Sequence, residues 1–485
     1  MTGIMLRALR LALALIMAVL ALATPALAQM SASERQQGAQ AHPQLLAQFG
    51  GAYTGPGHAM VQKLGRQMAI EAGLTRDGSG CTVTLLNSTV PNAFAIPGCY
   101  IYVTRGLMAL MNSEAELASV LGHEIGHVAA RHGQKRQRNS TIAGLGAIAA
   151  AVLTGSSTVG QMAGSLGQTV VLSYSRNQEY EADRLGIQYM TRAGYDPRAS
   201  AKMLAALAAE ERFQARLRGR DTMARVPQWM RTHPLTDERV REARRLAQQA
   251  RPQPGGRLGR DEYLLALDGQ TYGDDPAQGF VEGPSFAHPV LRLAFRAPPG
   301  FVLQNSPTAV TGQGPAGERF QFGGAPLPPG TSLGSYAQAV ARQVVGNAPV
   351  QVGQLQGSTV NGVDAAILPM RARSNAGPVD VVVATLRAEA DRGYHFVLIG
   401  PAGQTEWAQT LINSFRRLSP AEAASLRARE IHIVTVARDD TIESLGRRMA
   451  YADRPVDRFR VLNDLEGSDA QLVPGQRVKL VRYAR

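Results

Sequence analysis

Two histidines and a glutamate lie close together in the sequence, at His123, Glu124 and His127. On an α-helix, residues i and i+4 lie one turn apart on the same face, so the two imidazoles can point at one metal ion. Glu124 then lies beside the position of a water molecule that the metal would activate. This H-E-x-x-H spacing predicts a zinc site with hydrolytic chemistry.

The residues on both sides of this motif favour a helix. Residues 114–121 are rich in good helix formers, and residues 128–130 leave the motif without a proline. We therefore expect one continuous helix, which would fix the spacing of the two imidazoles.

A zinc site of this type needs a third protein ligand and an open fourth position. Glu179 lies 52 residues after His127 (179 − 127), and Glu181 competes with it. Glu179 and Asp183 are at i and i+4 on one helix face, whereas Glu181 is rotated by about 200° from Glu179. We expect Glu179 to bind the metal and Asp183 to steady a ligating histidine. An ordinary solvated helix face remains the alternative for Asp183.

Four ordered motifs resemble metallopeptidase family forty-eight, which includes the HtpX and CAAX prenyl protease group and the periplasmic BepA-like proteases. They are N-A-F-A-I-P-G at 92–98, H-E-x-x-H at 123–127, S-R-x-x-E-x-x-A-D at 175–183 and T-H-P-L-T-D-E-R at 232–239. The resemblance runs from about residue 42 to about residue 245. Cys99 departs from it, because the family more often has a second glycine there.

The resemblance implies a mainly helical, gluzincin-like zincin domain with one zinc ion per chain. His123, His127 and Glu179 would hold the zinc, and Glu124 would act as the general base. We expect this domain to hydrolyse peptide bonds.

The resemblance also suggests groups that act on the substrate. His233 and Arg239 are the candidate donors to the oxyanion. A structural turn at His233 remains the alternative, and in BepA-like relatives the equivalent histidine can bind the zinc and block it. Asn92 and Ala93 are expected on an edge strand, where they could pair with an extended substrate backbone.

The first 28 residues have the pattern of a secretory signal peptide. Arg7 and Arg10 precede an apolar run at 11–22 that is too short to span a bilayer, and Ala-Leu-Ala at 26–28 fits a cleavage site. An uncleaved anchor is the alternative. We expect an exported, periplasmic protein, and export excludes nucleic acid as a natural partner.

The chain has 485 residues, enough for about three domains. Its formal charge of +13 falls to +11 (13 − 2) once Arg7 and Arg10 leave with the signal peptide. A basic exported chain favours anionic envelope surfaces, although a general preference for arginine explains the same charge.

Cys81 and Cys99 are the two cysteines of the chain. An even pair in an oxidising compartment often forms a disulfide. Both cysteines precede runs of strand character, at 82–86 and 100–103, so we expect a hairpin to bring them together. Two free buried thiols remain the alternative.

The remaining sequence predicts the domain organisation. We expect the zinc domain at 42–250, a linker at 251–256 and an α+β accessory domain at 258–420, which faintly resembles the DcrB/PsbP-like fold. Residues 430–485 resemble a LysM module with βααβ order, carrying L-N-D-L at 462–465 and L-V-P-G-Q at 472–476. The overall fold class is α+β. The uncharged apolar stretch at 141–171 is expected to form either a lid or core helices.

We therefore expect an exported zinc endopeptidase that acts on misfolded or unassembled cell-envelope proteins. Two alternatives remain open: a peptidoglycan-associated protein, suggested by the LysM-like segment, and a chaperone-like envelope assembly factor with little proteolysis. Beyond protein substrates, peptidoglycan and the outer-membrane assembly machinery are the candidate partners.

Overall fold

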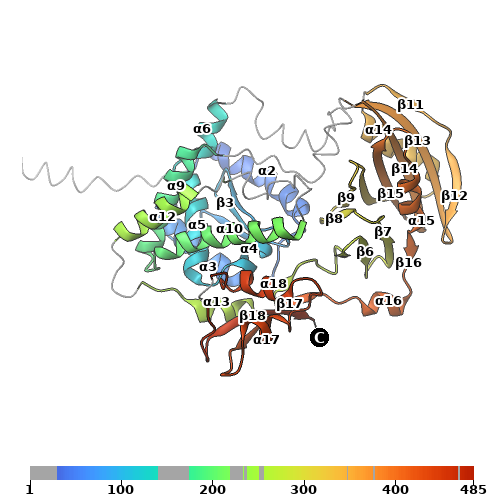
Figure 1. Cartoon of the computed structure of the whole chain (residues 1–485). Helices are drawn as coiled ribbons and strands as arrows, with labels where there is room; N and C mark the ends of the chain where they lie inside the picture. The colour runs from blue at the N-terminus through green and yellow to red at the C-terminus, as the bar shows by residue number, and fades with distance from the viewer. Residues whose placement is uncertain are drawn as a thin grey trace, which may run out of the picture.

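The computed structural model describes residues 30–139, 174–218, 233, 237–250, 256–346, 348–374, 377–467 and 470–484. Three expectations lie outside these ranges: the signal peptide at 1–28, the apolar stretch at 141–171 and the linker residues 251–255. The described residues form a mixture of helix and sheet, as predicted. Figure 1 shows a helical body, a sheet domain beside it, and a C-terminal module below the helical body.

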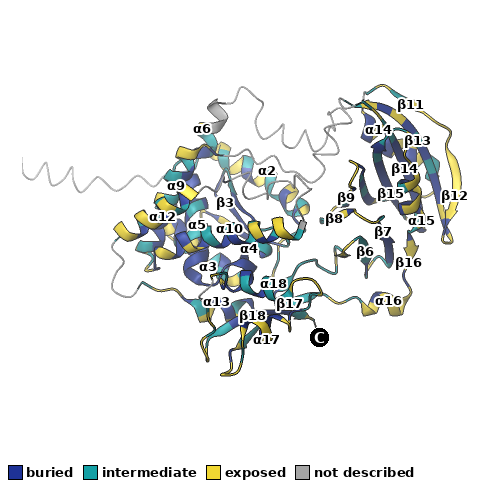
Figure 2. Cartoon of the chain, viewed as in Figure 1, coloured by how far each residue is buried: buried dark blue, intermediate teal, exposed yellow. Residues whose placement is uncertain are grey.

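The helical body comprises the described residues between 30 and 267. Its helices are α2 (Ala32–Gln48), α3 (His58–Glu71), α4 (Arg105–Leu110), α5 (Glu114–Ala129), α6 (His132–Asn139), α9 (Arg176–Arg192), α10 (Arg198–Arg218), α12 (Asp237–Gln249) and α13 (Arg260–Leu267). α5 packs against α3, α9 and α10, and it is mostly buried (Figure 2). Among the described residues, no helix is long and apolar enough to cross a membrane.

A three-stranded sheet packs against these helices. Its strands are β1 (Thr82–Leu86), β2 (Ala93–Ile96) and β3 (Tyr100–Thr104), in the order β1-β3-β2. β1 runs parallel to β3, whereas β2 pairs antiparallel with β3 and forms one edge. The edge strand β2 contacts α5, the helix that carries the H-E-x-x-H motif.

Cys81 and Cys99 form a disulfide, with their Cα atoms 4.7 Å apart. The expected hairpin between 82–86 and 100–103 is wrong, because these two strands run parallel with their first residues in register. Each cysteine immediately precedes its strand. Because the two strands are parallel, the disulfide joins their starts at the same end of the sheet.

Cys99 occupies a backbone conformation that usually favours glycine. Its φ is 60°, and that of Gly98 before it is 87°. A non-glycine residue is uncommon in this left-handed region. The tight backbone before β3 is therefore present even though a cysteine replaces the second glycine.

The sheet domain follows the helical body in sequence. Its larger sheet contains β8 (Val302–Asn305), β9 (Val310–Gln313), β10 (Arg319–Pro326), β11 (Val350–Val352), β12 (Gln356–Val360), β13 (Val363–Ser374), β14 (Gly377–Glu389) and β15 (Arg392–Pro401). Its smaller sheet contains β5 (Phe280–Glu282), β6 (Ser285–His288), β7 (Leu293–Arg296) and β16 (Arg416–Arg417), and its helices are α14 (Leu333–Val345), α15 (Glu406–Asn413) and α16 (Pro420–Ser425). α14 covers one face of the larger sheet, and an aromatic core fills the other.

The C-terminal module has the predicted βααβ order. Its elements are β17 (Arg429–Thr435), α17 (Ile442–Gly446), α18 (Pro455–Leu462) and β18 (Arg477–Tyr483). β17 pairs antiparallel with β18 on one side and with β4 (Thr271–Tyr272) on the other. The chain therefore leaves the helical body at β4, builds the sheet domain, and returns to the same place. The relation of this module to LysM remains a prediction.

The accessory domain does not start at residue 258 as expected, because α13 packs into the core of the helical body. Tyr263, Leu264 and Leu267 are fully buried in the same core as α3 and α5. These apolar side chains lie on one face of a short helix, and the helical body is the surface that covers them. The sheet domain begins downstream of β4.

A buried lysine joins the C-terminal module to the helical body. Lys479 of β18 is fully buried, and its Nζ donates hydrogen bonds of 2.7 Å to the carbonyl oxygens of Ala109 and Met111. Ala109 lies in α4 and Met111 directly follows that helix, so both acceptors belong to the segment that leads into α5. Burial lowers the pKa of Lys479, and the nearby carboxylate of Glu116 opposes this shift. The module thus supports the segment from which α5 begins.

We predict that Lys479→Met lowers the free energy of unfolding by about 1–3 kcal/mol, because it leaves two buried carbonyl oxygens without a donor. Denaturant unfolding measures the loss. Lys63→Met, at an exposed position of α3, is the matched control and should change stability little. Equal stability of the two variants would contradict the supporting role of Lys479.

Candidate metal centre

Two helices cross at close range to build the site. A Cβ atom added to Gly186 of α9 would lie 2.8 Å from the backbone nitrogen of His123 in α5, and one added to Gly122 would lie 3.0 Å from the carbonyl oxygen of Gly186. Contacts below 3.0 Å do not occur between a Cβ and a neighbouring backbone without displacement. The absence of side chains therefore lets α5 and α9 approach until their polar residues share one site.

Both helices begin at serine caps. Ser113 accepts a hydrogen bond from the backbone of Glu116 at the start of α5. Ser175 and Gln178 form a reciprocal capping box at the start of α9. Since Glu179 is the next residue, the cap fixes the register in which its side chain enters the site.

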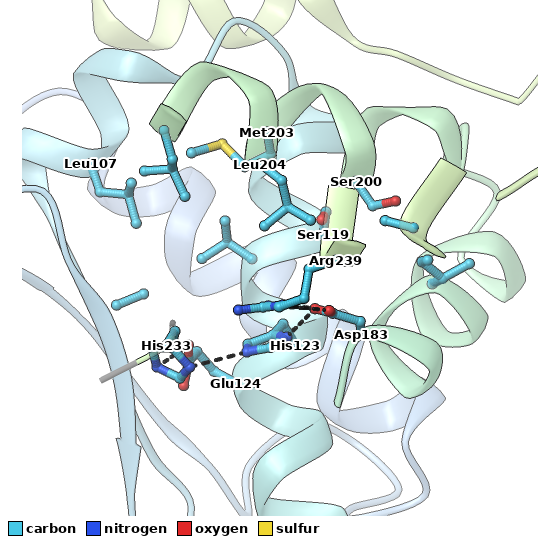
Figure 3. Close-up of a pocket in the computed structure, with 15 residues that line it drawn as sticks. Leu107, Ser119, His123, Glu124, Asp183, Ser200, Met203, Leu204, His233 and Arg239 are labelled. Atoms are coloured by element: carbon cyan, nitrogen blue, oxygen red, sulfur yellow. Dashed lines mark hydrogen bonds and ion pairs between the residues drawn. The ribbon is translucent and has the colours of Figure 1, made fainter. Parts of the chain in front are cut away.

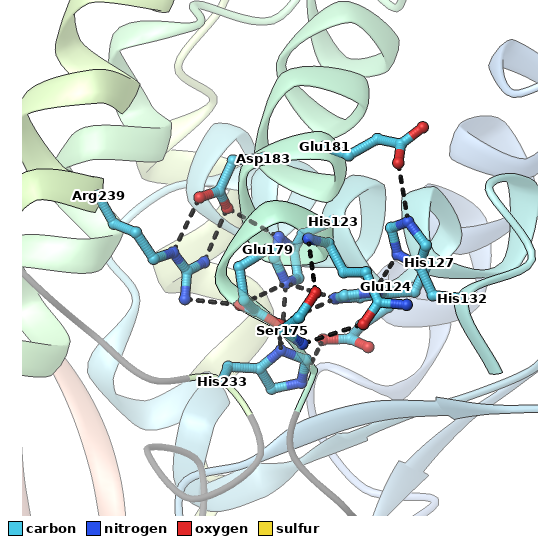
Figure 4. A network of polar contacts seen from close by, with 11 residues as sticks. His123, Glu124, His127, His132, Ser175, Glu179, Glu181, Asp183, His233 and Arg239 are labelled. Carbon is cyan, nitrogen blue, oxygen red and sulfur yellow. Dashed lines mark hydrogen bonds and ion pairs between the residues drawn. The ribbon is translucent and has the colours of Figure 1, made fainter. Parts of the chain in front are cut away.

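Four potential ligand residues converge between these helices (Figure 4). His123, His127, Glu179 and His233 each offer one ligand atom, and these atoms lie within 4.8 Å of one another. The Nε2 atoms of His123 and His127 are 3.1 Å apart, and Glu179 oxygens lie 3.4 Å from the Nε2 of His127 and 3.6 Å from that of His123.

These separations test whether an ion fits. A tetrahedral ion with bonds of 2.0–2.2 Å places its ligand atoms roughly 3.3–3.6 Å apart. The three measured separations are close to that range, and the donor set of two imidazoles and one carboxylate is the one that a catalytic zinc site uses. The residues present therefore fit a zinc ion.

Asp183 and Arg239 hold the ligands in place. Asp183 Oδ1 lies 2.8 Å from Nδ1 of His123, so the other ring nitrogen faces the site. Arg239 donates to both oxygens of Asp183 at 2.8 and 2.9 Å, and its Nη1 lies 2.7 Å from Glu179. Because its guanidinium is 5% exposed and bound to two carboxylates, Arg239 orients them. The expected role of Arg239 as an oxyanion donor stays a prediction, and these contacts indicate a positioning role in addition.

His127 has outer partners that sequence reasoning missed. Its Nδ1 lies 2.8 Å from Nδ1 of His132, whose Nε2 lies 3.1 Å from Glu181. Tyr174 stacks on the His127 ring with centroids 3.7 Å apart. Glu181 thus faces away from the ligands, as its helical rotation predicted, but it supports one of them indirectly. A histidine five residues after the motif, at the first residue of α6, was the available signal.

Burial and neighbouring charges shift the pKa values of three groups in the site. Burial raises the pKa of Glu124, which suits a group that accepts and returns a proton near neutral pH. Burial holds the pKa of His127 well below its usual value, so the imidazole is neutral, the form that binds a metal. Burial also opposes a charge on His233, but Glu179 and Glu124 outweigh it and raise the pKa of His233.

His233 lies at the fourth side of the ligand cluster. Its Nδ1 is 3.0 Å from Glu179 and 3.3 Å from Nε2 of His123, and its Nε2 is 3.5 Å from Glu124. The side chain is largely buried and touches both the ligands and the candidate base. It occupies the place that a zinc site of this kind keeps open for water or substrate.

The two residues that we expected to contact substrate lie at the start of the edge strand β2, where Asn92 precedes the strand and Ala93 is its first residue. The backbone of Asn92 is used by Thr104, which bonds to it through both its N–H and its Oγ1. The expectation that the backbone of Asn92 pairs with substrate is therefore wrong, because this backbone is already bonded to Thr104 and the Asn92 side chain is fully buried. Ala93 forms the next, non-hydrogen-bonded pair with Val103, so its N–H and carbonyl point away from β3 toward the edge.

Comparisons with known proteins agree with this site. Residues 57–247 match the model of Peptidase family M48. The "Beta-barrel assembly-enhancing protease" of Yersinia pestis is 35% identical over 191 residues, which cover 38% of this chain and 37% of that protein. The "Mitochondrial metalloendopeptidase OMA1" of Schizosaccharomyces pombe is 30% identical over 159 residues, covering 33% of this chain and 44% of that protein.

The helix-borne cluster of His123, His127 and Glu179 thus has the ligand set of a candidate metal centre. Residues 57–247 form a domain of peptidase family M48. The chain spans little more than a third of the length of the Yersinia pestis relative. Among solved structures, cyanobacterial PsbP from Synechocystis sp. PCC 6803 aligns over 30% of this chain and 98% of its own, with a TM-score of 0.23 and 12% identity. That score is too low to support the expected PsbP-like fold.

We predict close to one zinc ion per chain, and loss of that zinc in His127→Ala, because the variant removes one of the three protein ligands. Elemental analysis of the purified proteins measures the content. His432→Ala changes a half-buried histidine of the C-terminal module and should keep the zinc. Full zinc retention in His127→Ala would refute the ligand assignment.

We predict that Gly186→Ala weakens zinc binding by about tenfold or more, since the added methyl group pushes α9 and its two carboxylates away from α5. Competition with a chromophoric chelator measures the affinity. Gly133→Ala is the matched control, because a Cβ there meets nothing within 4 Å. Unchanged affinity in Gly186→Ala would show that the close crossing is not needed.

Proposed function

We propose that this protein is a zinc-dependent endopeptidase that hydrolyses peptide bonds of cell-envelope proteins. The observation that carries the proposal is the convergence of His123, His127 and Glu179 with spacings that fit one ion, next to the buried carboxylate of Glu124. The match to Peptidase family M48 supports the same chemistry.

Each residue of the site has a separate role in the proposed hydrolysis. Zinc, when bound, supplies Lewis-acid polarisation of the scissile carbonyl and makes water acidic enough to react at neutral pH. Glu124 would accept a proton from the attacking water and return it to the leaving amine. Asp183 and Arg239 fix the orientation of His123 and Glu179. Ala93 offers an edge backbone to which an extended substrate can add.

The substrate class rests on the relatives. Relatives from Yersinia pestis and Vibrio cholerae are named "Beta-barrel assembly-enhancing protease" and "Putative beta-barrel assembly-enhancing protease", the second 38% identical over 173 residues. By extension we propose that this protein is exported to the periplasm, as the signal-like N-terminus predicts, and cleaves misfolded or unassembled envelope proteins there. Peptidoglycan and the outer-membrane assembly machinery remain candidate partners.

We predict that Glu124→Gln removes proteolysis but keeps the fold and the zinc, because Glu124 moves the proton and is not a ligand. A casein digest and elemental analysis measure the two properties. Glu238→Gln, at an exposed position of α12, is the control and should keep full activity. Undiminished digestion by Glu124→Gln would refute the mechanism. Full complementation of a deletion strain by the inactive variant would favour the chaperone-like alternative.

We predict that His233→Ala raises basal cleavage, since the imidazole occupies the fourth side of the ligand cluster and must leave before a substrate carbonyl enters. The initial rate of casein digestion measures the effect. Loss of activity would instead assign His233 to the oxyanion. A rate equal to that of the unmodified protein would remove His233 from the mechanism.

A further inference from the structure

A cavity of about 70 Å³ opens directly beside the candidate metal centre (Figure 3). Its polar end is formed by residues of the site, including His123, Glu124 and His233. Behind this end, six large apolar side chains line it: Leu107, Val120, Ile187, Met203, Leu204 and Leu207. Its volume corresponds to several water-sized volumes of roughly 10–15 Å³ each.

The cavity belongs to the rigid frame of the site. Its apolar lining comes from α4, α5, α9 and α10. Val120 lies on α5 one turn before His123, so the cavity starts where the reacting carbonyl would lie. Met203 and Leu207 are buried at 2% and 8% exposure, whereas Val120 and Leu204 are only half-buried. The first pair is part of the core, and the second pair presents apolar surface to an entering group.

The charged groups that line the cavity lie at its polar end, beside the candidate metal centre. Asp183 and Arg239 form an ion pair at 2.8 Å, and Asp183 also bonds to His123. Glu124 and His233, 3.5 Å apart, also lie at this polar end. At the apolar end the polar lining consists of Ser119 and Ser200, and the Ser200 hydroxyl donates to the carbonyl of Pro197. An entering charged side chain would lose its water without gaining a partner there, whereas an apolar side chain would not.

An extended substrate that pairs with the edge strand β2 would run past this cavity. Ala93 lines the cavity, and its place in a non-hydrogen-bonded pair directs its backbone N–H and carbonyl away from β3. A substrate strand that pairs with Ala93 has side chains that alternate between its two faces. One of them can therefore enter the cavity while the neighbouring peptide bond lies at the metal centre.

We propose that this cavity is a substrate subsite that takes one large apolar side chain, of the leucine, methionine or phenylalanine class, adjacent to the scissile bond. Leu204 and Val120 set the size that it accepts. The inference rests on the proposed peptidase function and deepens it. Because folded proteins bury such side chains, the subsite selects chains that are unfolded or not yet assembled.

The first test uses quenched fluorescent peptides that differ only at the two residues flanking the cleaved bond, with cleavage sites mapped by mass spectrometry. Wild-type protein should cleave peptides with leucine or phenylalanine at one of these positions about tenfold or more faster, by kcat/KM, than those with alanine or lysine. Leu204→Trp fills the cavity and should reverse the preference toward alanine. Leu204→Ala enlarges it and should favour phenylalanine further.

Controls separate a change of the subsite from a change of the whole protein. Leu265→Trp, at a position of α13 that is 55% exposed, should keep the wild-type preference. Cleavage without preference at either position, or a preference unchanged in both Leu204 variants, would overturn the subsite while leaving the peptidase function standing. Loss of all cleavage in Glu124→Gln identifies the hydrolysis as that of this site.

A second readout does not depend on turnover. A hydroxamate that carries an isobutyl side chain and its methyl counterpart are titrated by calorimetry into zinc-loaded Glu124→Gln protein. The isobutyl compound should bind about tenfold or more tightly, and Leu204→Trp introduced into this protein should abolish the difference. Equal affinities before the tryptophan is introduced would refute the subsite. Failure to load zinc would refute the proposed function instead.

Discussion

The close crossing of α5 and α9 is the constraint on which the rest of the site depends. Two glycines, Gly122 and Gly186, bring the helix backbones near enough for Glu179 to reach the imidazoles of α5. The same approach places Asp183 against His123, and Arg239 then ties Asp183 to Glu179. Since neither glycine offers a ligand atom, the geometry of the candidate metal centre depends partly on residues without a polar side chain.

Local patterns in the sequence predicted the parts of the site that lie along single helices. The spacing of His123 and His127, and the choice of Glu179 over Glu181, follow from the period of an α-helix. The predictions that were wrong concerned contacts between separate elements. The parallel pairing of β1 and β3 replaced the expected hairpin, and Thr104 takes the backbone of Asn92. No local pattern encodes such partners, because they are set by tertiary packing.

The same distinction holds for domain boundaries. The element order of the C-terminal module was predictable from its motifs, but its attachment was not, because β17 pairs with β4 across the whole sheet domain. The sequence predicted that α13 begins a new domain, because a segment with the composition of a linker precedes it. Its buried face, with Tyr263 at the centre, instead completes the core around α5. A composition change marks flexible sequence and does not show which core covers the next helix.

The hydrogen bonds of Lys479 also bear on the order of events during synthesis. They connect residues about 370 positions apart, so the chain directly before α5 obtains its final surroundings only after β18 has emerged. Contacts of such long range form late, and domains that precede them wait in an incomplete state. The topology thereby makes the last strand of the chain a requirement for the completed surroundings of the helix that carries His123 and His127.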